Sequence, residues 1–336
     1  MSAYRVAIVG ATGVVGETVA RILEERRFPL SSLRAFATQR SAGSVVRSGS
    51  CEAVVEAIDA SAPDVSLFDG VDLTFFAVGD AVSAAYGRLI AERGVLVIDK
   101  SSAYRLDPDV PLVVPEVNGV AISGHRLIAN PNCSTIPLAM AVAPIDRAFG
   151  LAWVSVSTYQ SVSGAGRDAV DEFSAQTRGE DHAAAALPKR IAGNVIPEVG
   201  SFEAGGDSGE ESKIAGELRK VISRPDLPVS ATTVRVPVAV GHSEAVAFAT
   251  KKAASREQIR EVLANAPGVT FTDGTAYATP LDVAGTDAVA VGRLRPDRAH
   301  DDAWLVWIVC DNLRKGAATN AVQIAESALR CVPVAV

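Results

Sequence analysis

The chain has 336 residues, with 32 Lys and Arg against 39 Asp and Glu, and a net charge of −7. This length suits two packed domains. The negative charge, with no long basic run to offset it, argues against a nucleic-acid-binding surface. No apolar run reaches the ~20 residues that a membrane-spanning helix needs, and the N-terminus shows no secretory signal. We therefore expect a cytoplasmic protein without nucleic-acid or membrane partners.

The first half of the chain alternates short apolar segments with amphipathic ones. Strands are predicted over Arg5–Val9, Leu33–Ala37, Leu73–Ala77, Val95–Asp99 and Leu112–Val114, and helices over Glu17–Arg26 and Ala81–Arg93. Short buried strands that alternate with helices are typical of a parallel sheet with right-handed crossovers. This half is predicted to be an α/β domain of the Rossmann type.

After Phe149 the apolar residues follow a period of two. Strands are predicted over Trp153–Tyr159, Val234–Val240 and parts of Ala245–Thr250 and Leu305–Val309, with helices over Ala165–Thr177, Glu210–Ile222 and Ala317–Arg330. Long strands with alternating polarity favour a mixed or antiparallel sheet that has one more solvent-exposed face, and such a face is suited to dimer contacts. We expect a dinucleotide-binding domain over residues 1–132, completed by a C-terminal helix over 313–336, and an α+β catalytic and dimerisation domain over 133–312.

A glycine-rich turn follows the first strand directly. Gly10-Ala11-Thr12-Gly13-Val14-Val15-Gly16 lies between that strand and the first helix. Glycines allow the tight turn and the close approach of a pyrophosphate to the backbone, and the helix N-terminus then faces the phosphates. The context predicts a dinucleotide site; a tight turn without a ligand is the alternative.

The segment after the second strand bears on the choice of cofactor. A site that prefers NAD usually places Asp or Glu here to accept from the ribose 2′-hydroxyl, but Ala37-Thr38-Gln39-Arg40-Ser41 contains no carboxylate. Arg40, with Thr38 and Ser41, instead offers charge and hydrogen bonds to a 2′-phosphate. NADP is therefore predicted, with a merely solvated Arg40 as the alternative.

The stretch Asn130-Pro131-Asn132-Cys133-Ser134-Thr135-Ile136-Pro137 contains the candidate nucleophile. The apolar run Pro137–Ala143 predicts a helix with Ser134 or Thr135 as its N-cap. A cysteine at a helix N-terminus is favoured as the reactive thiolate by the helix dipole and the unpaired amides. The alternative is a small buried cysteine before a core helix. The cysteines show neither CxxC spacing nor clustering with the four histidines, so no metal site is expected.

Polar residues at strand ends supply further candidates. Gln160 ends a strand and can orient a carbonyl, and the turn Ser163-Gly164 can approach a cofactor closely. His242 follows a glycine at a strand end and is a candidate acid/base. Arg235 lies seven residues before His242, an odd spacing that would separate the two side chains on a single strand. Taken singly, each of these residues also has an ordinary structural interpretation.

Two charged sites remain. Glu210 and Lys213 share one face of a predicted helix, where an ordinary surface ion pair is the alternative. Arg105 follows a strand at its carboxyl end, where open α/β sheets bind ligands.

Together these segments resemble the aspartate-semialdehyde dehydrogenase family over essentially the whole chain. The resembling segments are GATGVVG from Gly10, SAYR from Ser102, NPNCST from Asn130, STYQSVSGAG from Ser157, RVPV from Arg235, GHSEAV from Gly241 and DNLRKGAATNAVQIAE from Asp311. The resemblance implies reversible NADP-dependent reductive dephosphorylation of L-aspartyl 4-phosphate to L-aspartate 4-semialdehyde, a step towards lysine, threonine, methionine and diaminopimelate. It also implies a homodimer, with a tetramer left open.

The resemblance assigns a role to each candidate. Cys133 is implied as the nucleophile that carries an acyl-thioester and His242 as the acid/base, while Gln160 and Asn132 orient the carbonyl. Arg105 and Lys213 are implied to hold phosphate, Arg235 the α-carboxylate and Glu210 the α-amino group. The implied cofactor contacts are Gly10, Thr12, Gly13, Val14, Val15, Arg40, Ser41, Ser163, Gly164 and Asn312.

One segment departs from the family pattern. Gly206-Asp207-Ser208-Gly209 lacks the Tyr-Thr that usually precedes the Glu-Glu-x-x-Lys helix. The sequence therefore leaves open whether Glu210, Glu211 or Glu217 meets the substrate amine, and whether Lys213 or Lys220 meets the phosphate. The rival functions are an N-acetyl-glutamyl-phosphate reductase and a catalytically silent NADP-binding relative.

Overall fold

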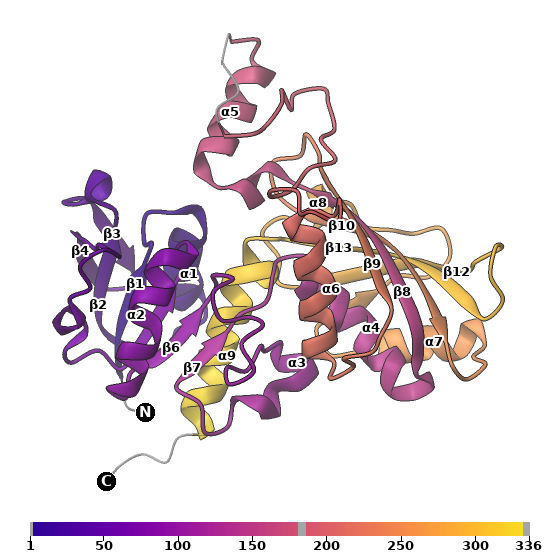
Figure 1. Ribbon diagram of the computed structural model, residues 1–336, viewed down its shortest axis with the longest axis horizontal. Helices are drawn as coiled ribbons and strands as arrows, with labels where there is room; N and C mark the ends of the chain where they lie inside the picture. Colours follow the sequence, from indigo (N-terminus) through magenta and orange to yellow (C-terminus); the bar gives the residue numbers. More distant parts are fainter. Residues whose placement is uncertain (1–2, 181–185, 332–336) are drawn as a thin grey trace. The chain divides into compact units, whose positions relative to one another are not determined.

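The computed structural model describes residues 3–180 and 186–331. The chain forms two compact units: one contains the residues up to Pro131 together with those from Ala317 onward, and the other is Asn132–Gly316. Both units are α/β structures, each built around one sheet (Figure 1). An α/β fold with a Rossmann-type domain and a second, mixed-sheet domain is thereby confirmed.

The first unit contains a seven-stranded sheet in the order β3-β4-β2-β1-β5-β6-β7. Its strands are β1 (Tyr4–Val9), β2 (Leu30–Ala37), β3 (Val45–Ser48), β4 (Cys51–Ala57), β5 (Leu73–Phe76), β6 (Leu96–Asp99) and β7 (Leu127–Ala129). All neighbours pair in parallel except β3 and β4. From β1 the chain builds outward through β2 and β4 and then crosses to β5 on the other side. Such a switch point, here between β1 and β5, is where doubly wound sheets bind ligands.

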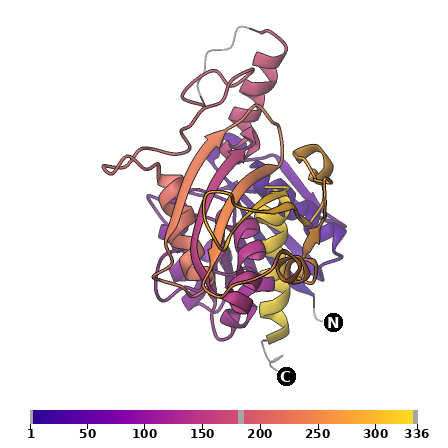
Figure 2. The same cartoon turned by 90° about the vertical axis from the view of Figure 1, so that its right-hand side faces the viewer.

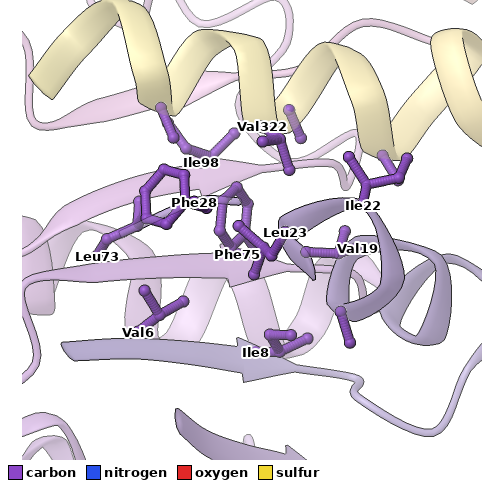
Figure 3. Packing of buried hydrophobic residues seen from close by; sticks show 14 of the residues in the cluster. Val6, Ile8, Val19, Ile22, Leu23, Phe28, Leu73, Phe75, Ile98 and Val322 are labelled. Atoms are coloured by element: carbon purple, nitrogen blue, oxygen red, sulfur yellow. The ribbon is translucent and has the colours of Figure 1, made fainter. Parts of the chain in front are cut away.

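The helices of this unit are α1 (Val14–Glu25), α2 (Asp80–Glu92), α3 (Pro115–Asn118) and α9 (Thr319–Cys331). The core lies where α1 and α9 pack on the sheet (Figure 3): Ile22 and Leu23 of α1 and Val322 of α9 meet Phe75 and Ile98 of the strands. Full burial of one such side chain contributes about 1.5–3 kcal/mol.

The C-terminal region differs from the expected helix over 313–336. Residues Arg314–Ala318 form a π-helical turn, and α9 begins only at Thr319. The Asp311 carboxylate accepts hydrogen bonds from the amides of Leu313 and Arg314, which belong to the second unit, whereas the residues from Ala317 onward belong to the first. Positions 332–336 lie outside the described residues.

The second unit contains a six-stranded sheet in the order β11-β12-β13-β10-β8-β9. The strands are β8 (Leu151–Gln160), β9 (Val229–Arg235), β10 (His242–Thr250), β11 (Val269–Phe271), β12 (Val289–Pro296) and β13 (Ala303–Cys310). The pairs β8–β9 and β11–β12 are parallel and the others antiparallel. Its helices are α4 (Thr135–Phe149), α5 (Arg167–Thr177), α6 (Gly209–Val221), α7 (Arg256–Ala264) and α8 (Pro280–Val283).

Helices α4, α6 and α7 contact the strands of this sheet. In contrast, α5 projects away from the strands in both views (Figures 1 and 2). It is supported by a small separate cluster in which Val162 and Ala169 pack with Leu187, Ile191 and Ile196.

Two predicted strands are wrong. Leu112–Val114 forms only a single bridge, between Leu112 and Ala129. The expected strand Val234–Val240 is displaced, since β9 covers Val229–Arg235 and ends before Pro237. Proline has no amide to donate to a neighbouring strand, which favours termination there. Among the described residues, no helix has both the length and the apolar character to span a membrane.

Candidate active site

The turn after β1 has a geometry that only glycine tolerates at its first position. Gly10 has φ +84°, and a Cβ there would lie 2.3 Å from the carbonyl oxygen of Ala77. Helix α1 begins at Val14 with Gly13 as its N-cap, and no side chain caps it. Its first amides are therefore available to an anionic ligand.

Beside this turn lies a hollow of about 530 Å³, lined by residues that include Thr12, Arg40 and Ser41. The Thr12 hydroxyl donates to Ser41 Oγ over 3.0 Å. Arg40 is exposed and, within the described part of the chain, forms no ion pair. Glu17 and Arg47 also line the hollow, so it carries two cations and one carboxylate.

Arg105 belongs to the first unit and follows β6. It is buried, and its Nη2 donates to the carbonyl oxygen of Lys100 over 2.5 Å. This backbone bond fixes the direction of the guanidinium.

In the second unit, four buried side chains form a row across one end of the sheet. Gln160 ends β8 and pairs with Arg235 at the end of β9. His242 begins β10 and pairs with Cys310 at the end of β13. Since Ser243 pairs with Tyr159, His242 lies beside Gln160. The order across the sheet is thus Arg235, Gln160, His242, Cys310, and the odd spacing of Arg235 and His242 is immaterial because they lie on different strands.

Cys133 lies immediately before α4. Ser134 is the N-cap residue of that helix, and its amide donates to Asn132 Oδ1 over 2.8 Å. Gln160 Nε2 donates to Ser134 Oγ over 3.2 Å. The Cys133 side chain is half-buried. The start of α4 is therefore tied to the row of sheet residues.

Arg235 is the cation of this cluster. Its Nη1 donates to the Ser161 carbonyl oxygen over 2.9 Å, while its Nε has no hydrogen-bond partner among the described residues. Burial lowers the pKa of Arg235, and the nearby charges of Cys133 and Glu210 oppose that shift. The free donor of a buried guanidinium is suited to an acidic ligand.

His242 is 1% exposed and held from one side by Ser161. The Ser161 amide and hydroxyl both lie 3.1 Å from His242 Nδ1. On the other side of the ring, a Cβ at Gly164 would lie 3.0 Å from His242 Nε2 and 2.9 Å from Arg235 Nη1. Gly164 therefore lets the backbone approach both groups, which a larger residue would displace.

The three carboxylates of α6 have different environments. Glu210 Oε1 accepts from Asn132 Nδ2 over 2.8 Å and from Gln160 Nε2 over 3.2 Å. Glu211 instead accepts from the amides of Ser208 and Thr233, and Glu217 accepts from the Asn132 amide. Glu210 thus bonds to Gln160, a side chain of the row. Lys213, half-buried one turn further on, forms no hydrogen bond or ion pair within the described residues.

Two family models match the chain. Residues 5–125 match the semialdehyde dehydrogenase NAD binding domain, and residues 142–315 match the semialdehyde dehydrogenase dimerisation domain. The aspartate-semialdehyde dehydrogenase of Aquifex aeolicus is 46% identical over 334 residues, covering 96% of this chain and 97% of that protein. The chain belongs to the aspartate-semialdehyde dehydrogenase family.

Other members of the family support this placement. The aspartate-semialdehyde dehydrogenase of Bacillus subtilis is 42% identical over 96% of both chains. The crystal structure of aspartate semialdehyde dehydrogenase II from Vibrio cholerae superposes with a TM-score of 0.92, with 42% identity over 98% of this chain and 99% of that one. A second structure of that protein, complexed with ASA, gives a TM-score of 0.93 at 41% identity over the same shares.

The residues singled out from the sequence for this dehydrogenase fold divide between the two units. The second unit joins Asn132, Cys133, Gln160, Glu210, Arg235 and His242 in one cluster, and links Ser163 to Asn312 through a bond of 3.0 Å. The first unit contains Gly10, Thr12, Gly13, Val14, Val15, Arg40, Ser41 and Arg105. Within the described residues, no group of three or more His, Cys, Asp and Glu side chains could hold a metal ion.

Sequence reasoning missed Ser161, Cys310 and the cap of α6. Ser208 and Glu211 form a reciprocal capping box at the start of that helix, and the Ser-x-x-Glu spacing was a readable signal for it. No such signal marks Ser161 or Cys310, because their place beside His242 depends on strand register.

Proposed function

We propose that this chain catalyses the reversible reductive dephosphorylation of L-aspartyl 4-phosphate to L-aspartate 4-semialdehyde, with NADPH as reductant and an acyl-thioester on Cys133. The observation that carries the proposal is the cluster itself: a thiol at a helix N-terminus, next to a row containing Arg235, Gln160 and His242, with Glu210 bonded to that row.

The covalent step uses the features around Cys133. The thiolate attacks the acyl carbon, a carbon–sulfur bond forms, the carbon–oxygen bond to phosphate breaks, and phosphate departs with the electron pair. Arg235 and the first amides of α4 stabilise the thiolate. A nicotinamide cofactor, when held at the glycine turn after β1, would supply the hydride that the thioester needs.

The tetrahedral intermediate that follows reduction of the thioester is handled by His242, Gln160 and Asn132. His242 gives a proton to the carbonyl-derived oxygen and takes it back as the carbon–sulfur bond breaks, which leaves the aldehyde and a thiolate. The Gln160 amide orients the carbonyl, and Asn132 fixes both the start of α4 and the Glu210 carboxylate. We assign Lys213 and Arg105 to the phosphate that enters or leaves.

The polar ends of the substrate fit the remaining groups. Arg235 has a buried donor available for the α-carboxylate, and Glu210 has the charge that an α-ammonium requires. Glu211 and Glu217 are occupied by backbone amides, so the geometry favours Glu210 among the three. This pair separates the proposal from an N-acetyl-glutamyl-phosphate reductase, whose acetylated substrate would present a neutral amide to Glu210.

The test compares kcat/KM for aspartate semialdehyde and N-acetyl-glutamate semialdehyde. The oxidation is followed through cofactor absorbance at 340 nm with phosphate present. We expect kcat/KM for aspartate semialdehyde to exceed that for N-acetyl-glutamate semialdehyde by at least a factor of roughly 10 to 100, which is the cost of losing a charge-assisted hydrogen bond. A preference for the acetylated compound would overturn the substrate assignment. Full turnover to free aspartate without phosphate or arsenate would show a hydrolytic dehydrogenase instead.

We further propose NADP rather than NAD as the cofactor. Support comes from the hollow beside the glycine turn, where Arg40 lies with the hydroxyls of Thr12 and Ser41 and has no ion pair to any described residue. We expect Arg40→Asp to reduce or reverse the preference, because a carboxylate repels a 2′-phosphate and accepts from a 2′-hydroxyl. Equal kcat/KM with NADP and NAD in the unmodified protein would contradict this proposal.

We infer that the protein acts as a homodimer through the outer face of the second-unit sheet. That face presents Trp153, Tyr159, Leu305 and Trp307 as exposed or half-buried side chains, and the rings of Tyr159 and Trp307 lie 5.7 Å apart. Light scattering of the purified protein distinguishes a dimer from a tetramer. We place the enzyme in the cytoplasm, in the route to lysine, threonine, methionine and diaminopimelate.

A further inference from the structure

We propose that Ser161 is a positioning residue that supports His242 in both of its charge states, with its amide serving the neutral ring and its hydroxyl the protonated ring. The inference rests on the acid/base role proposed for His242. Ser161 is fully buried and follows the last residue of β8. Its amide nitrogen and its Oγ both lie 3.1 Å from His242 Nδ1.

The Ser161 amide determines which tautomer the neutral His242 ring adopts. A backbone N–H can only donate, so Nδ1 must accept and the single proton of a neutral ring must sit on Nε2. Nε2 is the nitrogen that faces Gly164 and the neighbourhood of Arg235. The Ser161 amide thus directs the exchangeable proton of the neutral ring to the side of the catalytic cluster.

The hydroxyl becomes necessary when the ring is protonated. Both ring nitrogens then donate, and a buried Nδ1–H beside a backbone N–H requires another acceptor. Ser161 Oγ can accept a hydrogen bond from Nδ1–H while its own hydroxyl donates a hydrogen bond to Asn312 Oδ1, 3.0 Å away. The Gly241 amide also donates to this oxygen over 2.8 Å, so the Asn312 amide is fixed with its oxygen towards Ser161.

The other charged groups around the ring are unaffected by changes at residue 161. Arg235 lies on the Gly164 side and interacts with the charges of Cys133 and Glu210. Cys310 pairs with His242 and is itself subject to the charges of Glu244, Asp311 and Lys315. All of these side chains remain when Ser161→Ala removes only the hydroxyl, so a change in the titration of His242 would report on that hydroxyl.

The first measurement needs no substitution. With imidazole-¹⁵N labelling, each of the four histidines of the chain gives its own pair of nitrogen signals, and His242→Asn assigns those of residue 242. We expect the neutral His242 ring to carry its proton on Nε2. A proton on Nδ1 would overturn the proposal.

The second measurement is the pH titration of the same signals in Ser161→Ala. We expect the inflection to move to lower pH by roughly one to two pH units, because a hydrogen bond to a charged donor is lost. The His242-dependent limb of the kcat profile should move in parallel while KM for the semialdehyde changes little. Ser161→Thr, which keeps both the amide and the hydroxyl, should restore the titration, and Ser230→Ala, at an exposed position of β9, is the control.

An unchanged inflection in Ser161→Ala would overturn the proposed role of the hydroxyl. Failure of the underlying function looks different: His242→Asn would retain the activity of the unmodified enzyme, whatever the tautomer proves to be.

Discussion

The two sheets of this protein bury their polar groups in different ways. In the first unit, the buried Asp99 at the end of β6 accepts from Ser83 Oγ at 2.8 Å and from the Ser101 hydroxyl at 2.6 Å. Burial raises the pKa of Asp99, and these bonds oppose the shift. In the second unit, the buried Glu244 on β10 has no hydrogen-bond partner for either oxygen among the described residues, and burial raises its pKa well above the usual value.

Leaving a buried polar group without a partner costs about 1–3 kcal/mol. Among the described residues, this condition occurs at Thr74 Oγ1 on β5 of the first unit. In the second unit it occurs at Glu244, on the same strand as His242, and at Arg235 Nε, on the strand next to that of Gln160. The first unit has an apolar core in which side chains such as Phe75 pack against two helices. Substitutions in the row that contains Gln160 and His242 should therefore chiefly alter rate, and substitutions in the core around Phe75 should chiefly alter stability.

The largest effect is expected at Cys133. Cys133→Ala removes the sulfur on which the proposed thioester forms, so turnover should be abolished while cofactor binding and the melting temperature remain. Initial rates and cofactor fluorescence titration measure the two properties. The matched control is Cys51→Ala, at a free cysteine of the first unit. Appreciable turnover in Cys133→Ala would contradict the covalent mechanism.

The next effect is expected in the apolar core of the first unit. Phe75 is 1% exposed, and Phe75→Ala should lower the free energy of unfolding by about 3–5 kcal/mol, since it removes buried area and leaves a cavity. Urea denaturation measures this. Phe202→Ala, at a side chain that is 58% exposed, should change stability little. Equal losses in the two variants would contradict the packing described for this core.

The smallest effect is expected at Glu244. Because burial raises its pKa, the folded protein keeps the proton at pH values where the unfolded chain has released it. The contribution of the neutral Glu244 carboxyl to the stability of the folded protein is fully present below the unfolded-state pKa and is lost as pH rises. Glu244→Gln should therefore raise Tm at pH 8 by about 2–4 °C, the change that roughly 1 kcal/mol produces in a large domain.

That gain should disappear near pH 4, where both states of the unmodified protein hold the proton. Thermal melts at the two pH values provide the measurement, and Glu261→Gln on the exposed side of α7 is the control. A gain of the same size at both pH values would show that the effect does not come from ionisation.

Some elements were readable from the sequence because their signals are local. The glycine turn at Gly10, the helix after Cys133 and the strand that ends at Gln160 all depend on neighbouring residues. The bridge at Leu112 and the position of β9 were not predicted, because short apolar runs do not reveal whether a partner strand lies alongside. The choice among Glu210, Glu211 and Glu217 likewise required the backbone amides that occupy two of them.

The sequence by itself determined the fold class, the family and the residue types that carry the chemistry, because motif spacing and hydrophobic period are properties of contiguous segments. Tertiary structure decided which of these residues meet. Arg235, Gln160, His242 and Cys310 come from four different strands, and only the register of those strands places them in one row. The contact of Ser161 with His242 Nδ1 follows from the same register, since 81 positions of chain separate the two residues.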